Sequence, residues 1–406
     1  MDVAVVGAGA AGLMAALSAA GGGRKVVLLE RTADGGRKIL ISGGGRCNIL
    51  PSEVESDWFV TDSSPHSLRK MLRTWPLDAQ RRFFEHELGI PLALEKETGK
   101  LFPASNRARE VRDRLVEQAR DRGADLRFNS QFRDLRRSGD DWELTFESGS
   151  PMRARTVILA TGGLSVPQTG SDGAGLRLAE RLGHRMRPTY PALTPLTTGV
   201  SRWTALSGVS LDAHLTAAPE TPRYSRTQGL LFTHRGFSGP AVLNISHVAT
   251  RPRPGAAPPI LARWGGVEAS TWVGDLGVGG RVHLGTVLRR RLPERLAIAL
   301  LAEAGVAPDR PLAQLRREER DAVLTVLTAM PLPVSGSEGY RKAEVTGGGV
   351  DLGEVDPGTM ESRSAPGLFL CGEMLDAFGP IGGFNFLWAW ATGRAAGLGA
   401  VQRLTT

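Results

Sequence analysis

The fold of the chain is decided by residues 3–12, which read Val3-Ala4-Val5-Val6-Gly7-Ala8-Gly9-Ala10-Ala11-Gly12. A short apolar run leads directly into three spaced glycines, and an alanine-rich segment and a second apolar run, Val26 to Leu29, follow. This order predicts a strand, a tight turn, a helix and a second strand. In such a unit the first glycine permits the turn, the second lets a pyrophosphate approach the backbone, and the third lets the helix pack on the sheet. We therefore predict a dinucleotide-binding βαβ unit.

Glu30 ends the second predicted strand, 18 residues after Gly12. A carboxylate at this place accepts hydrogen bonds from both hydroxyls of an adenosine ribose and repels a 2′-phosphate. The site therefore suits FAD or NAD and disfavours NADP. This first unit alone leaves the choice between FAD and NAD open.

Further glycine-rich segments occur at residues 43–45, 161–163, 372–373 and 382–385. Residues 156–160 form a continuous apolar run before the second of them, which predicts a buried strand that ends at a ligand site. The third segment places a glycine and an acid after a predicted buried strand. The fourth places two glycines before a predicted helix. This arrangement suits a flavin, because the helix start directs N–H groups at the pyrimidine edge of the ring. The later segments thus favour FAD over NAD.

The composition is that of an ordinary globular protein of 406 residues, with 41% hydrophobic and 23% charged residues. The length suggests two or three domains. No run of eighteen or more apolar residues predicts a membrane helix, and Asp2 stands where a secretory signal would carry basic residues. We therefore expect a cytoplasmic protein with no membrane partner.

The chain contains two cysteines, Cys47 and Cys371, and seven scattered histidines. Two cysteines form no disulfide framework, and the histidines show none of the spacings typical of metal ligands. No metal site is predicted, and the sequence leaves the oligomeric state open.

The formal net charge is +8. Arginines cluster at several places, such as residues 289–291, which allows two interpretations. In other clusters, such as residues 110–114, acidic residues alternate with the arginines, as on a solvated helix face. We favour solvated faces and keep a polyanion-binding surface as the alternative.

The character of the sequence changes at Pro188 and changes back at Val345. Prolines and short alternating strands to about Trp272 predict a β-rich domain, and the apolar spacing from Val282 to Leu327 predicts helices. The first domain is therefore predicted to be discontinuous and completed by the C-terminal segment.

Five stretches of the chain resemble a known family. They read GAGAAGLMAA, GRKILISGGGRCN, ATGGLSVPQTGSDGAG, EVTGGGVDLGEVDPGTMES and FLCGEMLDAFGPIGGFNFLWAWATG. On these motifs the chain is similar to the YhiN-like, or BaiN-like, FAD-dependent oxidoreductases, also called the aminoacetone oxidase family. The resemblance implies an α/β fold with a glutathione-reductase-like Rossmann FAD domain over residues 1–189 and 344–406. It also implies an inserted β-barrel domain, residues 190–280 and 331–343, that carries a small helical subdomain, residues 281–330.

The motifs and the resemblance together define a predicted cofactor site for FAD. Its members are Gly7, Gly9, Ala10, Ala11, Gly12, Glu30, Arg31, Gly36, Arg37, Lys38, Ser42, Gly43, Gly44, Arg46, Cys47, Asn48, Ala160, Thr161, Gly162, Gly163, Gly372, Glu373, Asp376, Gly382, Gly383, Phe384 and Asn385. The chain departs from the family at Leu387, where a glutamine is usual, and at Ile49-Leu50-Pro51, where the family continues with Thr-Asn. Flavin binding is expected to survive both changes.

Two side chains are candidates for a catalytic role. Cys47 would act as a proton donor or charge-transfer partner near the flavin, although a small buried residue that shapes the glycine loop is the favoured interpretation. Arg46 would offset negative charge on the flavin or an anionic substrate, and a structural role bonding loop carbonyls is the alternative.

Three functional hypotheses follow. The first is a flavin-dependent reductase of an activated C=C bond, or an oxidase, acting on a small molecule. The second, also implied by the resemblance, is a flavin-dependent reductase that forms dihydrouridine in RNA, for which the arginine excess would supply phosphate contacts. The third is a flavoprotein without turnover. NAD(P)H is a candidate transient electron donor, although no second GxGxxG predicts a dedicated domain for it.

Overall fold

The computed structural model describes residues 1–218 and 224–405 and divides the chain into two compact units. Unit 1 comprises Met1–Tyr190 and Val345–Thr406, and unit 2 comprises Pro191–Glu344. The chain thus enters unit 2 once and returns from it once.

Unit 1 is built on a five-stranded sheet in the order β20-β10-β1-β2-β6. Its strands are β1 (Val3–Val6), β2 (Val26–Leu29), β6 (Asp125–Arg127), β10 (Thr156–Leu159) and β20 (Leu368–Leu370). All neighbouring pairs are parallel, and β1, β2, β10 and β20 are buried along their whole lengths. Continuous apolar runs are what a parallel sheet covered on both faces requires. The predicted α/β Rossmann-like sheet is confirmed.

Helix α1 (Ala10–Ala19) packs against the long helix α14 (Phe384–Arg403). The two backbones approach closely, because a Cβ on Gly393 would lie 2.3 Å from the carbonyl oxygen of Ala11. One turn later, a Cβ on Gly397 would lie 2.4 Å from the carbonyl oxygen of Ala15. The two glycines therefore form a notch into which α1 fits.

The remaining elements of unit 1 surround this core. They are α2 (Arg37–Ile41), β3 (Leu50–Pro51), α3 (Pro65–Arg73), α4 (Leu77–Arg82), β4 (Leu92–Glu95), β5 (Lys100–Pro103), α5 (Ala108–Asp121), β7 (Phe132–Ser138), β8 (Asp141–Phe146), β9 (Met152–Ala154), α6 (Ala174–Arg181), β11 (Met186–Ala192) and β19 (Val345–Val350). Strand β11 runs two residues past Tyr190 into unit 2, and it pairs with β19. Two small antiparallel sheets, β3-β5-β4 and β7-β8-β9, complete the unit.

The buried strand predicted over residues 156–160 is confirmed as β10, which enters the parallel sheet, while the preceding strand β9 pairs with β8 in a separate sheet. At the start of α5, Asn106 lies in the left-handed region (φ +54°), and Arg107 holds the N-cap position.

Unit 2 contains a seven-stranded sheet in the order β17-β16-β13-β14-β15-β12-β18, in which every described pairing is antiparallel. The strands are β12 (Leu196–Thr197), β13 (Ser210–Thr216), β14 (Gln228–Thr233), β15 (Gly236–Ser238), β16 (Leu261–Trp264), β17 (Met330–Pro331) and β18 (Gly336–Ser337). Short helices α7 (Ser201–Thr204), α8 (Pro240–Ile245) and α9 (His247–Thr250) flank it. Since β17 and β18 stand at the two ends of this order, the closed barrel stays a prediction.

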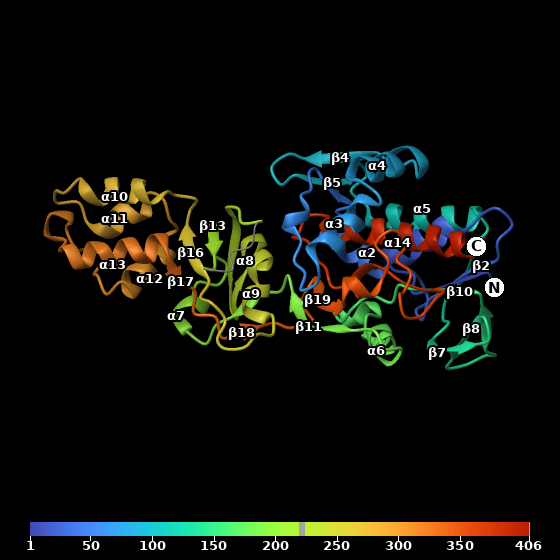
Figure 1. Cartoon of the computed structure of the whole chain (residues 1–406). Helices are drawn as coiled ribbons and strands as arrows, with labels where there is room; N and C mark the ends of the chain where they lie inside the picture. The colour runs from blue at the N-terminus through green and yellow to red at the C-terminus, as the bar shows by residue number, and fades with distance from the viewer. Residues whose placement is uncertain (219–223, 406) are drawn as a thin grey trace. The chain divides into compact units, whose positions relative to one another are not determined.

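Four helices form the helical part of unit 2, next to β16 and β17 (Figure 1). They are α10 (Ala269–Gly277), α11 (Leu284–Arg289), α12 (Glu294–Glu303) and α13 (Arg317–Thr328). The prediction of strands to about Trp272 was wrong, because helix α10 already begins at Ala269. Trp272 and Leu276, four residues apart, are both buried on one face of that helix.

The notch in α14 leads to a prediction about the free energy of unfolding. In Gly393→Ala the new methyl group would meet the backbone of α1, which cannot yield cheaply, so the free energy of unfolding should fall by about 1–3 kcal/mol. Gly274→Ala is the matched control, since Gly274 also lies in a helix but a Cβ there would meet nothing within 4 Å. The control should be neutral or slightly stabilising. Urea unfolding of both variants tests this, and equal midpoints would contradict the notch.

Candidate cofactor site

The turn after β1 shows why three glycines stand there. Gly7 has φ +101°, and a Cβ on it would lie 2.5 Å from the carbonyl oxygen of Ala160. A Cβ on Gly12 would lie 1.8 Å from the carbonyl oxygen of Gly7. A Cβ on Gly9, by contrast, would meet no protein atom within 4 Å. Two glycines thus serve packing, and Gly9 leaves room for a ligand at the N-terminus of α1.

Glu30 is partly exposed and lies beside this turn. Its Oε2 accepts a hydrogen bond from the Ala8 N–H (2.8 Å), and its Oε1 accepts from the N–H and the hydroxyl of Thr32 (2.9 and 2.8 Å). These bonds fix the orientation of the carboxylate. Oε2, which accepts one bond, retains capacity to accept a further bond from a ribose hydroxyl.

Lys38 and Glu373 form an ion pair across 335 residues of sequence, with 2.6 Å between Nζ and Oε2. Their side chains are 26% and 17% exposed. Burial raises the pKa of Glu373, but the charge of Lys38 and its hydrogen bonds outweigh burial, so the pKa lies below its ordinary value. The pair joins α2 to the turn after β20.

Ser165 and Thr346 complete the cluster around this ion pair, and neither is among the site residues that the sequence predicts. Ser165 accepts a hydrogen bond from Lys38 Nζ (2.7 Å) and donates to Glu373 Oε1. The Thr346 N–H donates to the same oxygen (2.9 Å), and its hydroxyl accepts from the Leu164 N–H (2.7 Å). Both residues lie inside glycine-rich motifs, and no spacing in the sequence marks their hydroxyl groups as part of a site.

The glycines after Thr346 are buried in β19. A Cβ on Gly347 would lie 2.3 Å from the ring of Tyr190, and one on Gly348 would lie 2.1 Å from the carbonyl oxygen of Pro188. They permit close packing within unit 1.

Asn48 connects the glycine loop of residues 43–45 to the start of α14. With its side-chain amide oriented to satisfy both atoms, the nitrogen donates to the Leu50 carbonyl (3.2 Å) and the oxygen accepts from the Gly383 N–H (3.1 Å). Asn385 shapes the preceding loop, because its amide bonds both the N–H and the carbonyl of Gly379 (2.9 and 3.0 Å). Both side chains therefore hold backbone segments of the candidate site in place through hydrogen bonds.

Arg46 is bound to the β4–β5 hairpin. Its Nη1 donates to Glu95 (3.1 Å), its guanidinium lies 4.0 Å from the centre of the Phe102 ring, and its Nε donates to the Gly43 carbonyl (3.4 Å). These contacts favour the structural alternative for Arg46. Arg31 similarly pairs with Asp172 (2.5 Å), and Arg37 with Asp34 (2.9 Å).

Cys47 is fully buried at φ +62°. Burial raises the pKa of its thiol to about 12, so the thiol stays protonated at neutral pH. The thiol has no exposed surface in this conformation, which favours the structural interpretation of Cys47 in the glycine loop. Its catalytic role stays a hypothesis.

Asp376 is also buried, and its carboxylate oxygen Oδ2 accepts from the Ser63 hydroxyl (2.7 Å) and the Asp62 N–H (2.9 Å). Burial raises its pKa, and the hydrogen bonds from Ser63 and Thr61 only partly offset this. Asp376 thus holds the segment before α3 in place, and its position beside the flavin stays a prediction.

The other predicted residues fall into two groups. Partly or fully exposed are Gly7, Gly9, Ala10, Glu30, Arg31, Arg37, Lys38, Ser42, Gly43, Gly44, Arg46, Thr161, Gly162, Glu373, Gly382 and Asn385. Buried behind them are Ala11, Gly12, Gly36, Asn48, Ala160, Gly163, Gly372, Gly383 and Phe384. Leu387 and Leu50, which depart from the family pattern, are buried as well, so both departures change the core.

The parallel sheet and the glycine turn define a dinucleotide-binding protein of the Rossmann-like class. The chain belongs to the HI0933-like family, since the family model described as "HI0933-like protein Rossmann domain" matches residues 1–399. This is the FAD-dependent oxidoreductase family, YhiN-like or BaiN-like, that the motifs resemble, so the resemblance and the assignment as an enzyme are confirmed.

Two curated relatives and one solved structure are similar over almost the whole chain. The chain is 34% identical to the "Ribosomal RNA dihydrouridine synthase" of Escherichia coli (strain K12), covering 96% of both chains. It is 30% identical to the "3-dehydro-bile acid delta(4,6)-reductase" of Clostridium scindens, covering 99% of both. A flavocytochrome c3 fumarate reductase in an open conformation aligns with a TM-score of 0.50 at 17% identity, over 100% of this chain and 78% of that one. This last likeness concerns the fold alone.

No helix within residues 1–218 and 224–405 is long and apolar enough to cross a membrane. In the same described part of the chain, no group of three His, Cys, Asp or Glu side chains is arranged to hold a metal ion.

Lys38→Met should show that the ion pair carries stability. Without Lys38 the burial of Glu373 dominates and its pKa should rise, so unfolding should cost about 2 kcal/mol less at neutral pH. In the wild type, the Glu373 carboxylate contributes fully to the free energy of unfolding above its ordinary pKa of 4.5. This contribution is lost as the pH falls through the lower pKa that Glu373 has in the folded protein. The deficit of the variant should therefore shrink on acidification toward pH 4.5, where its Glu373 takes up a proton. Urea unfolding at several pH values measures this.

The double variant Lys38→Met/Glu373→Gln is the control, and it should recover much of the loss at neutral pH because no charge is left buried alone. A deficit that does not change with pH would contradict the assignment.

Cys47→Ala tests the structural role of the thiol. Because the thiol is buried and protonated, the variant should keep its flavin content, its turnover and the pH profile of its turnover. The flavin absorbance and turnover between pH 6 and 9 are the measurements. A loss of about tenfold in turnover, about 1.4 kcal/mol, at full flavin occupancy would instead restore the catalytic hypothesis.

Proposed function

We propose that the protein is an FAD-dependent reductase that saturates the C=C bond of uridine in ribosomal RNA. The observation that carries the proposal is the similarity, along 96% of both chains, to a protein named for dihydrouridine synthesis in ribosomal RNA. The sequence motifs alone favoured a small-molecule substrate and kept RNA as the alternative. The similarity to the dihydrouridine synthase leads us to place RNA first and the small-molecule substrate second.

The geometry of unit 1 fits FAD. Gly9 leaves space where a pyrophosphate would lie, and the oriented carboxylate of Glu30 would bind the adenosine ribose. The exposed loop of residues 43–45 and the start of α14, joined through Asn48, would border the flavin. When bound and reduced, FAD supplies a hydride to an electron-poor carbon. The polar cluster of Lys38 and Glu373 fixes the loops on either side of this region.

The distribution of charge supports an RNA substrate. Unit 1 has 32 basic and 30 acidic residues, a net charge of +2, although it contains most of the chain. Unit 2 has 18 basic and 12 acidic residues, a net charge of +6. Solvated helix faces would not concentrate the excess in one unit. A concentrated excess is expected if unit 2 contacts phosphates.

A reductase of a C=C bond in a steroid-like molecule is the second candidate, and the 30% identity to the bile acid reductase favours it. Uracil and an unsaturated ketone share one feature, a C=C bond conjugated to a carbonyl group. Each accepts a hydride at one carbon and a proton at the next, so one flavin site serves either substrate. In both cases we propose NADH or NADPH as a transient donor that reduces the flavin.

The experiment incubates the holoenzyme anaerobically with NADH or NADPH, follows flavin bleaching, and then adds ribosomal RNA from a strain that lacks this protein. We expect bleaching, reoxidation on addition of RNA, and a mass gain of two hydrogen atoms on one uridine. Unchanged RNA combined with reduction of an unsaturated 3-oxo-steroid would favour the second candidate. Bleaching with neither substrate reduced would contradict both.

Gly9→Ala is the matched variant for this experiment. Its methyl group meets no protein atom, so the apoprotein should fold with an unchanged melting temperature. It would occupy the space for the pyrophosphate, so FAD affinity should fall about tenfold or more, which corresponds to about 1.4 kcal/mol. Undiminished flavin content would contradict the placement of the cofactor.

A further inference from the structure

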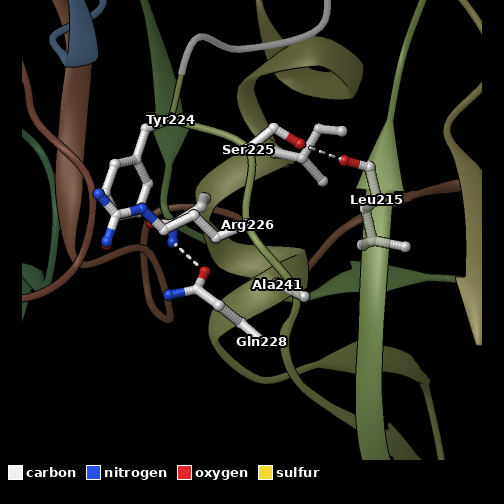
Figure 2. Close-up of a pocket in the computed structure, with 8 residues that line it drawn as sticks. Leu215, Tyr224, Ser225, Arg226, Gln228 and Ala241 are labelled. Carbon is white, nitrogen blue, oxygen red and sulfur yellow. Dashed lines mark hydrogen bonds between the residues drawn. The ribbon is translucent and has the colours of Figure 1, made fainter. Parts of the chain in front are cut away.

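Unit 2 contains a small hollow between β13 and α8, in which the Ser225 hydroxyl donates to the Leu215 carbonyl (3.0 Å) (Figure 2). The hollow has room for about one water molecule, which is too small for a substrate or a cofactor. The surfaces that border the candidate cofactor site in unit 1 offer more. They contain a charged side chain, Lys100, that has no part in the contacts described above.

One face of strand β5 lies against both segments that would border the flavin, the loop of residues 43–45 and the start of α14. Phe102 packs on the loop, since a Cβ on Gly43 would lie 3.1 Å from its ring. Lys100 is two residues earlier and so lies on the same face of the strand. Its stem packs on the start of α14, where a Cβ on Gly382 would lie 3.7 Å from Lys100 Cε. Lys100 therefore reaches the edge of the candidate site at which α14 begins.

The ammonium group of Lys100 has no fixed partner. Among residues 1–218 and 224–405, none forms a hydrogen bond or an ion pair with its Nζ, although the side chain is partly buried. Lys100 pairs with Glu95 across the β4–β5 ladder, but one carboxylate oxygen of Glu95 accepts from Arg46 (3.1 Å) and the other from the Thr98 hydroxyl. A partly buried cation whose nearest carboxylate is already engaged is expected beside a bound anion.

We propose that Lys100 lies beside the pyrimidine edge of bound FAD and stabilises the negative charge that two-electron reduction places there. The start of α14 carries a partial positive charge, but the Gly383 N–H is already taken by Asn48 (3.1 Å). Lys100 adds a full charge at this place, and charge near the flavin ring tunes its electronics. The electrons arrive as a hydride from the nicotinamide donor, while Lys100 keeps its proton and only offsets the charge that the hydride brings.

This is the role that the sequence suggests for Arg46, whose guanidinium is held by Glu95 and Phe102. The inference rests on the binding of FAD in the proposed function and does not depend on the choice of substrate.

The test reads the flavin of the holoenzyme without any substrate. Sulfite adds to an oxidised flavin and places negative charge on the pyrimidine ring, so its affinity reports a nearby cation. Lys100→Met keeps the stem on Gly382 but lacks the charge, so the dissociation constant for sulfite should rise about tenfold. The midpoint potential should fall by about 30 mV, the two-electron equivalent of tenfold, and it decides alone if the wild type binds no sulfite. Lys100→Arg should stay within about twofold of the wild type, because it keeps the charge.

Lys96→Met is the matched control. Lys96 is exposed in the turn between β4 and β5, so the variant removes the same charge from the same hairpin at a place that solvent screens. Its sulfite affinity should stay within about twofold of the wild type. Flavin absorbance and melting temperature should be unchanged in all three variants, because methionine and arginine retain the aliphatic stem.

The outcomes separate this inference from the proposed function. Wild-type sulfite affinity and potential in Lys100→Met, or equal changes in Lys100→Met and Lys96→Met, would overturn the role of Lys100 and leave the RNA reductase standing. An unchanged potential with a raised KM for RNA would also overturn it, since Lys100 would then contact the substrate. If Lys100→Met shifts the potential but the wild type reduces neither RNA nor the steroid, the proposed function fails and the role of Lys100 stands.

Discussion

The close approach of helix α1 to its neighbours is the constraint on which the rest of unit 1 depends. On one side a Cβ at Gly12 would overlap the carbonyl of Gly7, and on the other a Cβ at Gly393 would overlap the carbonyl of Ala11. The helix is thus held between the end of β1 and the side of α14. Its N-terminus faces the open space at Gly9 because both supports fix it there. Polar groups from distant segments can then converge on the same edge of the sheet.

The parts of this arrangement that sequence could predict are those with a local pattern. The strand, three glycines and acid from Val3 to Glu30 have a defined spacing, and the parallel sheet follows from continuous apolar runs. The notch formed by Gly393 and Gly397 has no such signal, because a glycine in a helix says nothing about which backbone it meets. The same holds for Ser165 and Thr346, whose importance arises only when Lys38 and Glu373 meet. Cys47 stands in a suggestive motif, and its burial, which the sequence does not reveal, favours a structural role.

The two units divide the chemistry of the chain. Unit 1 is nearly neutral and carries the buried polar contacts that hold loops in place, such as Asp376 with Ser63 and Asn48 with Gly383. Unit 2 carries most of the net positive charge, +6 of +8. Buried polar contacts therefore hold the backbone of the candidate cofactor site in one unit, and the excess positive charge lies in the other.

The discontinuity of unit 1 also has a consequence for biosynthesis. On the ribosome, β1, β2, β6 and β10 are translated before unit 2, but β20 and α14 are translated after it. Until then α1 lacks the partner that covers its alanine and glycine face, and Lys38 lacks Glu373. Unit 2, whose strands and helices are contiguous in sequence, is complete before that point. The nascent chain therefore exposes an unfinished parallel sheet throughout the synthesis of unit 2.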